Sequence, residues 1–260
     1  MHTRSCRQPV NPANNDRDQA VPDAEAFDAL RPWLSYLRPE LDGAMASWRA
    51  GSSVASALTA TRAKSADGNG VPHFVPRSAL PASEAYEAFI HRTAQVPTRN
   101  NLHDFFNGLV WLAMPALKWR LNALQAAEIA QHGVAAVRGP VRDALTLFDE
   151  SGALLQAPAV LLAALRARDW PALFITHRAA WGQARLTIIG HALLEKLATA
   201  PRKALTAQVL LADPLALDAA GWAAKPVAPL PVLGVPGWWP ANELPDFYDD
   251  PAVFRCHRVP

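Results

Sequence analysis

Apolar residues recur at helical spacing along most of the chain, and this pattern predicts a mainly helical protein. In the segment 83–95, for example, Tyr86, Phe89 and Ile90 fall on one face of a helix that Ser83 can cap. Periodicity, capping residues and helix-ending prolines or glycines predict further helices at 23–37, 41–62, 101–113, 116–131, 158–168, 170–181 and 191–198.

The period changes in the middle of the chain. Residues 143–148 and 153–155 flank the sequence Asp-Glu-Ser-Gly, which is typical of a hairpin turn. We therefore predict a short β-hairpin there, with Asp149 and Glu150 facing solvent in its turn. Residues 73–75 form a short extended piece, 185–189 suit either a strand or the start of the next helix, and 205–211 stay ambiguous.

The C-terminal segment is rich in proline and in large apolar side chains. Prolines recur at positions 226, 229, 231, 236, 240, 245 and 251, and this spacing excludes a long helix. The same segment carries two tryptophans, Trp238 and Trp239, among other large apolar residues, and leaving each in water would cost roughly 1.5–3 kcal/mol. We expect an extended tail packed on the helical body.

Together these patterns predict an α+β, mainly helical fold in a single domain. Residues 1–22 read as a disordered N-terminal tail, 23–224 as the helical core, and 225–260 as the extended tail wrapped on it.

Composition excludes several classes of protein. The 260 residues are 50% hydrophobic, too many for a disordered chain, and the net charge of +2 gives little support to nucleic-acid binding. Two cysteines, Cys6 and Cys256, cannot build a disulfide scaffold or a cysteine-based zinc site. We find no signal peptide and no membrane span, so we expect a soluble cytoplasmic protein with no membrane partner.

The densest polar cluster lies at Thr98–Asn107. His103 and Asn107 are four residues apart and share a helix face, with Asp104 beside them, which makes these three the candidate catalytic residues. Arg99 and Asn100 precede the helix, where backbone N–H groups favour an anion.

Arg142 completes this predicted anion- or cofactor-binding set, although it also suits a buried ion pair with the neighbouring Asp143. The alternative for the Thr98–Asn107 cluster is structural, with Asn100 or Asn101 capping the helix.

A second pair, His191 and Glu195, has the same four-residue spacing. The two side chains share a helix face and suit a divalent metal ion, although a hydrogen bond between them is the simpler alternative. We predict a metal site formed by His103, His191 and Glu195, joined by one carboxylate from Asp104, Asp143 or Asp149.

Four blocks of sequence resemble the bacterial DUF3025 family, a domain family of unknown function. They are PTRNNLHDFFNGLVWLAMPALKWRLN (97–122), RGPVRDALTLFDESGALL (138–155), GHALLEKL (190–197) and LGVPGWWPANELPDFYDD (233–250). The resemblance implies a bacterial origin but supplies no catalytic residues to transfer.

Two functional hypotheses follow. In the first, the chain is a metal-dependent hydrolase that uses His103, His191 and Glu195 to activate water on an unknown small molecule. In the second, it is a non-catalytic protein that binds an unknown partner, and its polar clusters are structural. GxSxG, Walker A, GxGxxG, HExxH and CxxC motifs are absent, which removes the commonest enzyme classes that these motifs mark.

Overall fold

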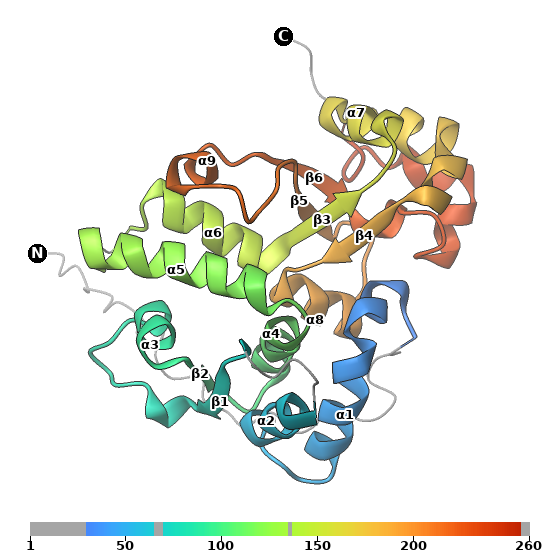
Figure 1. The fold of residues 1–260 in the computed structure, drawn as a ribbon. Coiled ribbons are helices and arrows are strands. Elements are labelled where there is room, and N and C mark those ends of the chain that lie inside the picture. The colour runs from blue at the N-terminus through green and yellow to red at the C-terminus, as the bar shows by residue number, and fades with distance from the viewer. Residues whose placement is uncertain (1–29, 65–69, 135–136, 256–260) are drawn as a thin grey trace, which may run out of the picture.

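The structure is a computed structural model that describes residues 30–64, 70–134 and 137–255 (Figure 1). The predicted disordered tail over 1–22, both cysteines, and residues 23–29 of the first segment predicted as a helix (23–37) lie outside the described residues, whereas Pro32–Leu37 of that segment form a 3₁₀ turn.

The described chain is mainly helical with two small sheets. Its α-helices are α1 (Arg38–Arg49), α2 (Val54–Lys64), α3 (Tyr86–Thr93), α4 (Leu102–Ala113), α5 (Pro115–His132), α6 (Pro140–Ser151), α7 (Ala159–Ala167), α8 (His191–Thr199) and α9 (Ala219–Ala223). Its strands are β1 (His73–Pro76), β2 (Gln95–Thr98), β3 (Gly152–Gln156), β4 (Arg185–Ile188), β5 (Thr206–Leu210) and β6 (Val227–Pro231). Short 3₁₀ turns and one π turn (Ala172–Thr176) join these elements.

The two sheets lie in different parts of the molecule (Figure 1). β1 and β2 form a parallel pair among the N-terminal helices. The larger sheet has the strand order β4-β3-β5-β6, in which β3 runs antiparallel to β4 and parallel to β5, and β6 runs antiparallel to β5. Helices α4, α5, α6 and α8 lie between the two parts (Figure 1).

The predicted β-hairpin at 143–155 is wrong. Residues 140–151 form α6, because Pro140 occupies its first turn and the apolar side chains Val141, Leu145 and Phe148 follow helical spacing into the core. Only β3 is a strand, and its antiparallel partner is β4, which lies beyond α7 in the chain. Asp149 and Glu150 therefore lie in the last turn of α6 and not in a hairpin turn.

Most of the other predicted helices are present with shifted ends. The segment 41–62 holds two helices, α1 and α2, and 170–181 holds the π turn and a 3₁₀ turn in place of one α-helix. Two segments have no definite prediction from the sequence, and both contain strands, at 185–188 and 206–210. β1 confirms the predicted extended piece at 73–75.

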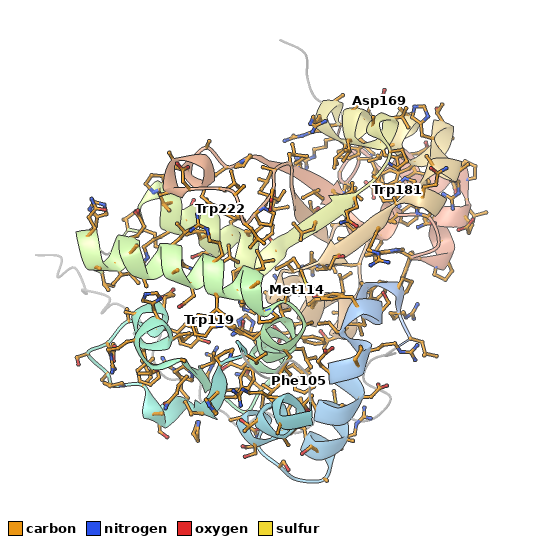
Figure 2. The ribbon with its side chains drawn as sticks, viewed as in Figure 1. Phe105, Met114, Trp119, Asp169, Trp181 and Trp222 are labelled. Atoms are coloured by element: carbon orange, nitrogen blue, oxygen red, sulfur yellow. The ribbon has the colours of Figure 1, made fainter. Side chains whose placement is uncertain are left out.

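Helix α4 is the centre of the helical body, because apolar residues surround nearly all of it. Phe105, Phe106 and Leu109 are completely buried, and Phe105 packs on Trp48 of α1 with ring centroids 5.0 Å apart (Figure 2). α4 packs against α2 on one side and α8 on another. No helix of the described residues is long and apolar enough to cross a membrane.

The proline-rich C-terminal segment is extended and packed on the rest of the chain, as predicted. β6 joins the larger sheet beside β5, although three of its bordering or internal residues are prolines, because it is an edge strand. Further on, Phe247, Tyr248 and Phe254 cluster around Phe174, whose ring stacks on Tyr248 with centroids 5.2 Å apart.

Gly190 allows the start of α8 to lie against the end of α6. A Cβ at position 190 would fall 2.3 Å from the Cα of Ser151 and 2.6 Å from the carbonyl carbon of Glu150, far inside van der Waals contact. The N–H groups of Ile189 and Gly190 both donate to the carbonyl of Gly152, at 2.8 and 2.9 Å. The backbone before α8 thus touches the backbone at the end of α6, next to Glu150 and His191.

We predict that Gly190→Ala destabilises the protein by about 3 kcal/mol, because the added methyl group meets backbone atoms that cannot rotate away. Urea unfolding followed by circular dichroism measures the change. Gly182→Ala is the matched control, since a Cβ at 182 meets nothing within 4 Å. Equal stability of the two variants would contradict the close approach.

Candidate functional site

Three helices bring the polar residues of the candidate site together. α4 begins at its N-cap Asn101, whose side chain accepts the N–H of Asp104 at 2.9 Å, and this places His103 in the first turn. α8 begins with His191, directly after Gly190, and the last turn of α6 supplies Asp149 and Glu150. These four side chains all reach one pocket.

The two histidines lie close together, as the hypothesis of a metal site requires. The Nε2 atom of His103 lies 3.0 Å from the Nε2 atom of His191, and the ring centroids are 4.4 Å apart. Glu150 joins them, with Oε1 at 3.7 Å from Nε2 of His191. One ligand atom from each of the three side chains lies within 4.8 Å of the others, so the group has the spacing of a metal site.

Glu195 contacts the imidazole ring of His103. Its Oε2 atom lies 3.1 Å from Nδ1 of His103, on the ring nitrogen that faces away from His191. The hydrogen bond to Glu195 raises the pKa of His103 above its ordinary value, against the opposing effect of partial burial. Glu195 thus contacts only His103, whereas Glu150 belongs with the two histidines to the group that has the spacing of a metal site.

His191 is buried, with 6% of its side chain exposed. Its Nδ1 atom lies 3.8 Å from Oδ2 of Asp149 and has no hydrogen-bond partner among the described residues. Burial lowers the pKa of His191 to about 3, although the charge of Asp149 acts in the opposite direction. The imidazole is therefore neutral at physiological pH, the form that binds metals.

A buried lysine lies beneath the pocket. Lys118 of α5 is 4% exposed, forms an ion pair with Asp149, and donates to Oδ1 of Asn107 at 2.9 Å. Asn107 in turn donates to the hydroxyl of Tyr86 at 3.2 Å. Burial pushes the pKa of Asp149 upward, but the charge of Lys118 and its hydrogen bond to the carboxylate are the main opposing causes, and the pKa lies below its usual value. Asp149 is therefore ionised next to His191.

The predicted catalytic residues differ in their surroundings. His103 faces the pocket, but Asp104 uses both carboxylate oxygens on Arg99, including a 2.8 Å bond to a guanidinium nitrogen. Both polar atoms of the Asn107 side chain are also engaged, by Lys118 and Tyr86. Asp104 and Asn107 thus hold other side chains in place.

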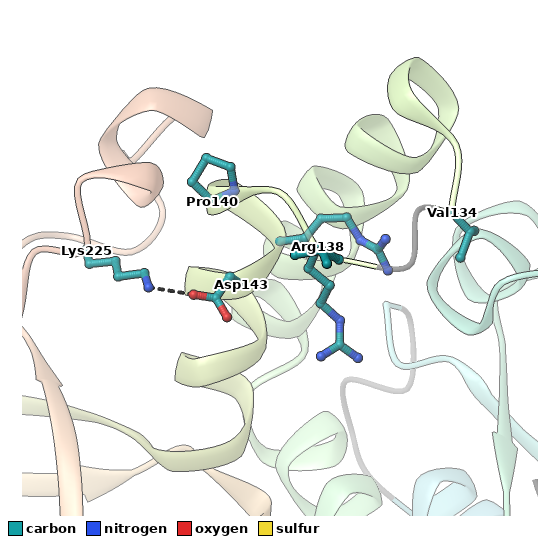
Figure 3. Close-up of a pocket in the computed structure, with 7 residues that line it drawn as sticks. Val134, Arg138, Pro140, Asp143 and Lys225 are labelled. Carbon is teal, nitrogen blue, oxygen red and sulfur yellow. Dashed lines mark hydrogen bonds and ion pairs between the residues drawn. The ribbon is translucent and has the colours of Figure 1, made fainter. Parts of the chain in front are cut away.

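The predicted anion-binding residues do not gather at one point. Arg99 lines the pocket, whereas the side chain of Asn100 accepts the N–H of Val54 at 3.0 Å, at the start of α2. Arg142 lies 4.0 Å from Glu87. The suggested ion pair between Arg142 and Asp143 is not what forms, because Asp143 pairs with Lys225 across to the C-terminal segment (Figure 3).

The pocket that contains the histidines is small, with a volume of about 240 Å³. Its lining includes Tyr86, Gln125 and three arginines in addition to the residues above. A wider hollow of about 780 Å³ lies at the start of α6, lined by Val134, Arg138, Pro140 and Lys225 among others (Figure 3). Since neither histidine lines that hollow, the smaller pocket is the candidate active site.

Sequence reasoning missed two of the residues that matter here. The hairpin prediction places Glu150 in a solvent-facing turn, and no metal-binding or catalytic motif includes Lys118. The helical spacing of Val141, Leu145 and Phe148 was the available signal for Glu150, since it places position 150 in the same helix. No local pattern marks Lys118, whose partners lie 11 and 31 residues away.

Comparison with known proteins identifies one family. The family model described as "Protein of unknown function (DUF3025)" matches residues 72–218 and 209–258, which is more than half of the chain. No curated protein and no solved structure matches this chain.

We predict that Lys118→Met destabilises the protein by roughly 2–4 kcal/mol, because it leaves the ionised Asp149 without its main partner. Asp149→Asn leaves the buried ammonium unpaired and has a cost of similar size.

The double variant Lys118→Met/Asp149→Asn should cost clearly less than the sum of the single changes, since neither charge is then left alone. Chemical unfolding of the four proteins measures this coupling. Additive effects would show that the two side chains do not interact in solution.

Proposed function

The chain belongs to the DUF3025 family, whose members have no known function, and we propose that it is a metal-dependent hydrolase with its ion held by His103, His191 and Glu150. The observation that carries the proposal is the approach of the two imidazoles, with their Nε2 atoms 3.0 Å apart in a partly buried pocket.

This spacing suits a zinc ion. Zinc–nitrogen bonds are about 2.0–2.1 Å long, so two imidazoles on a tetrahedral ion have their nitrogens about 3.3 Å apart. The distance of 3.7 Å from Nε2 of His191 to Oε1 of Glu150 is close to the same value. Two histidines and one glutamate are a ligand set used by catalytic zinc sites, which keep a fourth position for water.

The protonation of the rings supports the same conclusion. A carboxylate such as Glu195 accepts a proton from Nδ1 of His103, which leaves a lone pair on Nε2, facing His191. If Nε2 of His191 donated to that lone pair, Nδ1 of His191 would present its own lone pair to the carboxylate of Asp149 at 3.8 Å. A cation between the two Nε2 atoms instead allows Nδ1–H of His191 to face Asp149.

A zinc ion at this position would lower the pKa of its bound water to near neutrality. The residues of the chain then have defined tasks. His103 and His191 hold the ion, Glu195 and Asp149 orient their rings from behind, and Lys118 keeps Asp149 ionised. Tyr86 and Gln125 also line the pocket, where they are available to contact a substrate. In the reaction, water adds to the electrophilic centre, the bond to the leaving group breaks, and that group takes up a proton.

The non-catalytic hypothesis gives a different account of the same contact. Without a metal ion, one proton shared between His103 and His191 also explains a nitrogen–nitrogen distance of 3.0 Å, and the raised pKa of His103 is compatible with it. The two hypotheses differ in what the purified protein contains, so metal analysis separates them.

We predict that the metal-free protein binds one zinc ion per chain, and that His103→Ala, His191→Ala and Glu150→Gln each abolish stoichiometric binding, because each removes one ligand atom. Glu195→Gln should retain the site but weaken it roughly 10–100-fold, since it supports a ligand without being one. Isothermal titration calorimetry and elemental analysis give both values.

His132→Gln is the control, because this exposed histidine lies at the far end of α5. A zinc-free wild-type protein, in which His103→Ala lowers only the melting temperature, would reject the metal site and favour the non-catalytic hypothesis. Complete loss of zinc in Glu195→Gln, with full binding in Glu150→Gln, would restore Glu195 as the third ligand.

A further inference from the structure

The pocket around the histidines also carries three arginines, Arg77, Arg99 and Arg138. They come from three separate parts of the chain: Arg77 follows β1, Arg99 follows β2, and Arg138 precedes α6. Because no single element brings them together, their convergence is a property of the tertiary fold.

Most of the acidic side chains in the pocket have a basic partner. Asp104 binds Arg99 through two guanidinium contacts, and Asp149 forms its ion pair with Lys118. Glu87, the third, lies 4.0 Å from Arg142. Among the described residues that line the pocket, Glu150 is the carboxylate without an arginine or lysine in an ion pair.

The basic side chains leave a surplus. Within the described parts of the chain, Arg77 and Arg138 form no recorded ion pair. Arg138 lies near enough to Asp143 to contribute to the lowered pKa of that carboxyl, but Lys225 is the residue that binds it. Arg77 and Arg138 are exposed at the lining of the pocket, and with a divalent ion they would outnumber the one carboxylate that has no such partner, which leaves the pocket with a net positive charge.

A second observation indicates that the pocket is built for a polar ligand. Gln125 of α5 lines it and is 6% exposed, yet its Oε1 atom has no hydrogen-bond partner among the described residues. A buried acceptor without a partner costs stability unless a ligand supplies a donor, which a hydroxyl on the organic part of a substrate can do and a phosphate dianion cannot. Tyr86, whose hydroxyl accepts from Asn107, still has its own proton to donate.

We infer that the substrate is a small phosphate monoester whose phosphoryl group is bound by Arg77 and Arg138 next to the metal position. This inference rests on the proposed function and names its substrate class. A phosphoryl group carries a charge of about −1.5 to −2 at neutral pH, which offsets the surplus better than the single charge of a carboxylate. Guanidinium groups match phosphate oxygens in geometry as well as charge.

The size of the pocket limits the organic part of this substrate. A volume of about 240 Å³ is below the roughly 300–1,000 Å³ of pockets that take drug-sized ligands. In the reaction, water adds to phosphorus and the P–O bond to the organic group breaks. One proton of the water goes to the released alcohol, and inorganic phosphate remains as the second product.

The test titrates inorganic phosphate, the product of the reaction, into the zinc-loaded protein by calorimetry. Wild type should bind one phosphate, and Arg77→Gln and Arg138→Gln should each weaken binding roughly tenfold, as expected for the loss of one charged hydrogen bond. Arg185→Gln is the matched control, because Arg185 is exposed on β4 and does not line the pocket. Acetate, with one negative charge, should bind much more weakly than phosphate.

The outcomes separate the two proposals. Zinc binding without phosphate binding, or phosphate binding that Arg77→Gln and Arg138→Gln leave unchanged, overturns the phosphate site but not the metal site. Acetate binding as tight as phosphate binding overturns the phosphate assignment. If zinc does not bind at all, the proposed function fails, and arginine-dependent phosphate binding to the zinc-free protein would still support the phosphate site, whereas its absence would overturn it.

Discussion

The contact between Gly190 and the end of α6 is the constraint on which the site depends. Two backbones touch there, with the carbonyl of Gly152 receiving the N–H groups of both Ile189 and Gly190. Because α8 starts at the next residue, His191 emerges beside the last turn of α6, where Glu150 and Asp149 lie. A methyl group at position 190 would push the two backbones apart, whereas a functional site must hold its groups to within about 0.5 Å.

The charges around His191 impose a second requirement on the site. A buried imidazole such as His191 is neutral, and the carboxylate beneath it must be ionised for the ring to be oriented by charge. Lys118 supplies that condition, and Asn107 and Tyr86 satisfy the remaining polar atoms in turn. A buried lysine costs desolvation energy that better-packed apolar residues would avoid. Its presence therefore suggests that position 118 serves the site at some expense of stability.

The sequence predicted well what depends on local spacing. The helices at α4 and α8 and the packed proline-rich segment follow from periodicity, capping and residue chemistry. The approach of His103 to His191 is a product of the tertiary fold, which the predicted metal site requires but local spacing does not determine. Prediction from the sequence failed where tertiary packing decides between two local patterns. The segment of α6 has a glycine-containing end that resembles a turn, while its apolar residues follow helical spacing and are buried in the structure. That single error displaced Glu150 from the candidate ligands.

The choice of Glu195 at the sequence level and of Glu150 in the structure has one physical explanation. A four-residue helical spacing places Glu195 on the same face as His191, and this predicts that they share a partner. The partner they share is His103, which contacts Glu195 through Nδ1 and His191 through Nε2. An imidazole has two nitrogens on opposite sides, so one of them can take support from Glu195 while the other faces the pocket. The same bond that raises the proton affinity of His103 also makes it a stronger metal ligand, so a proton and a metal ion compete for one lone pair.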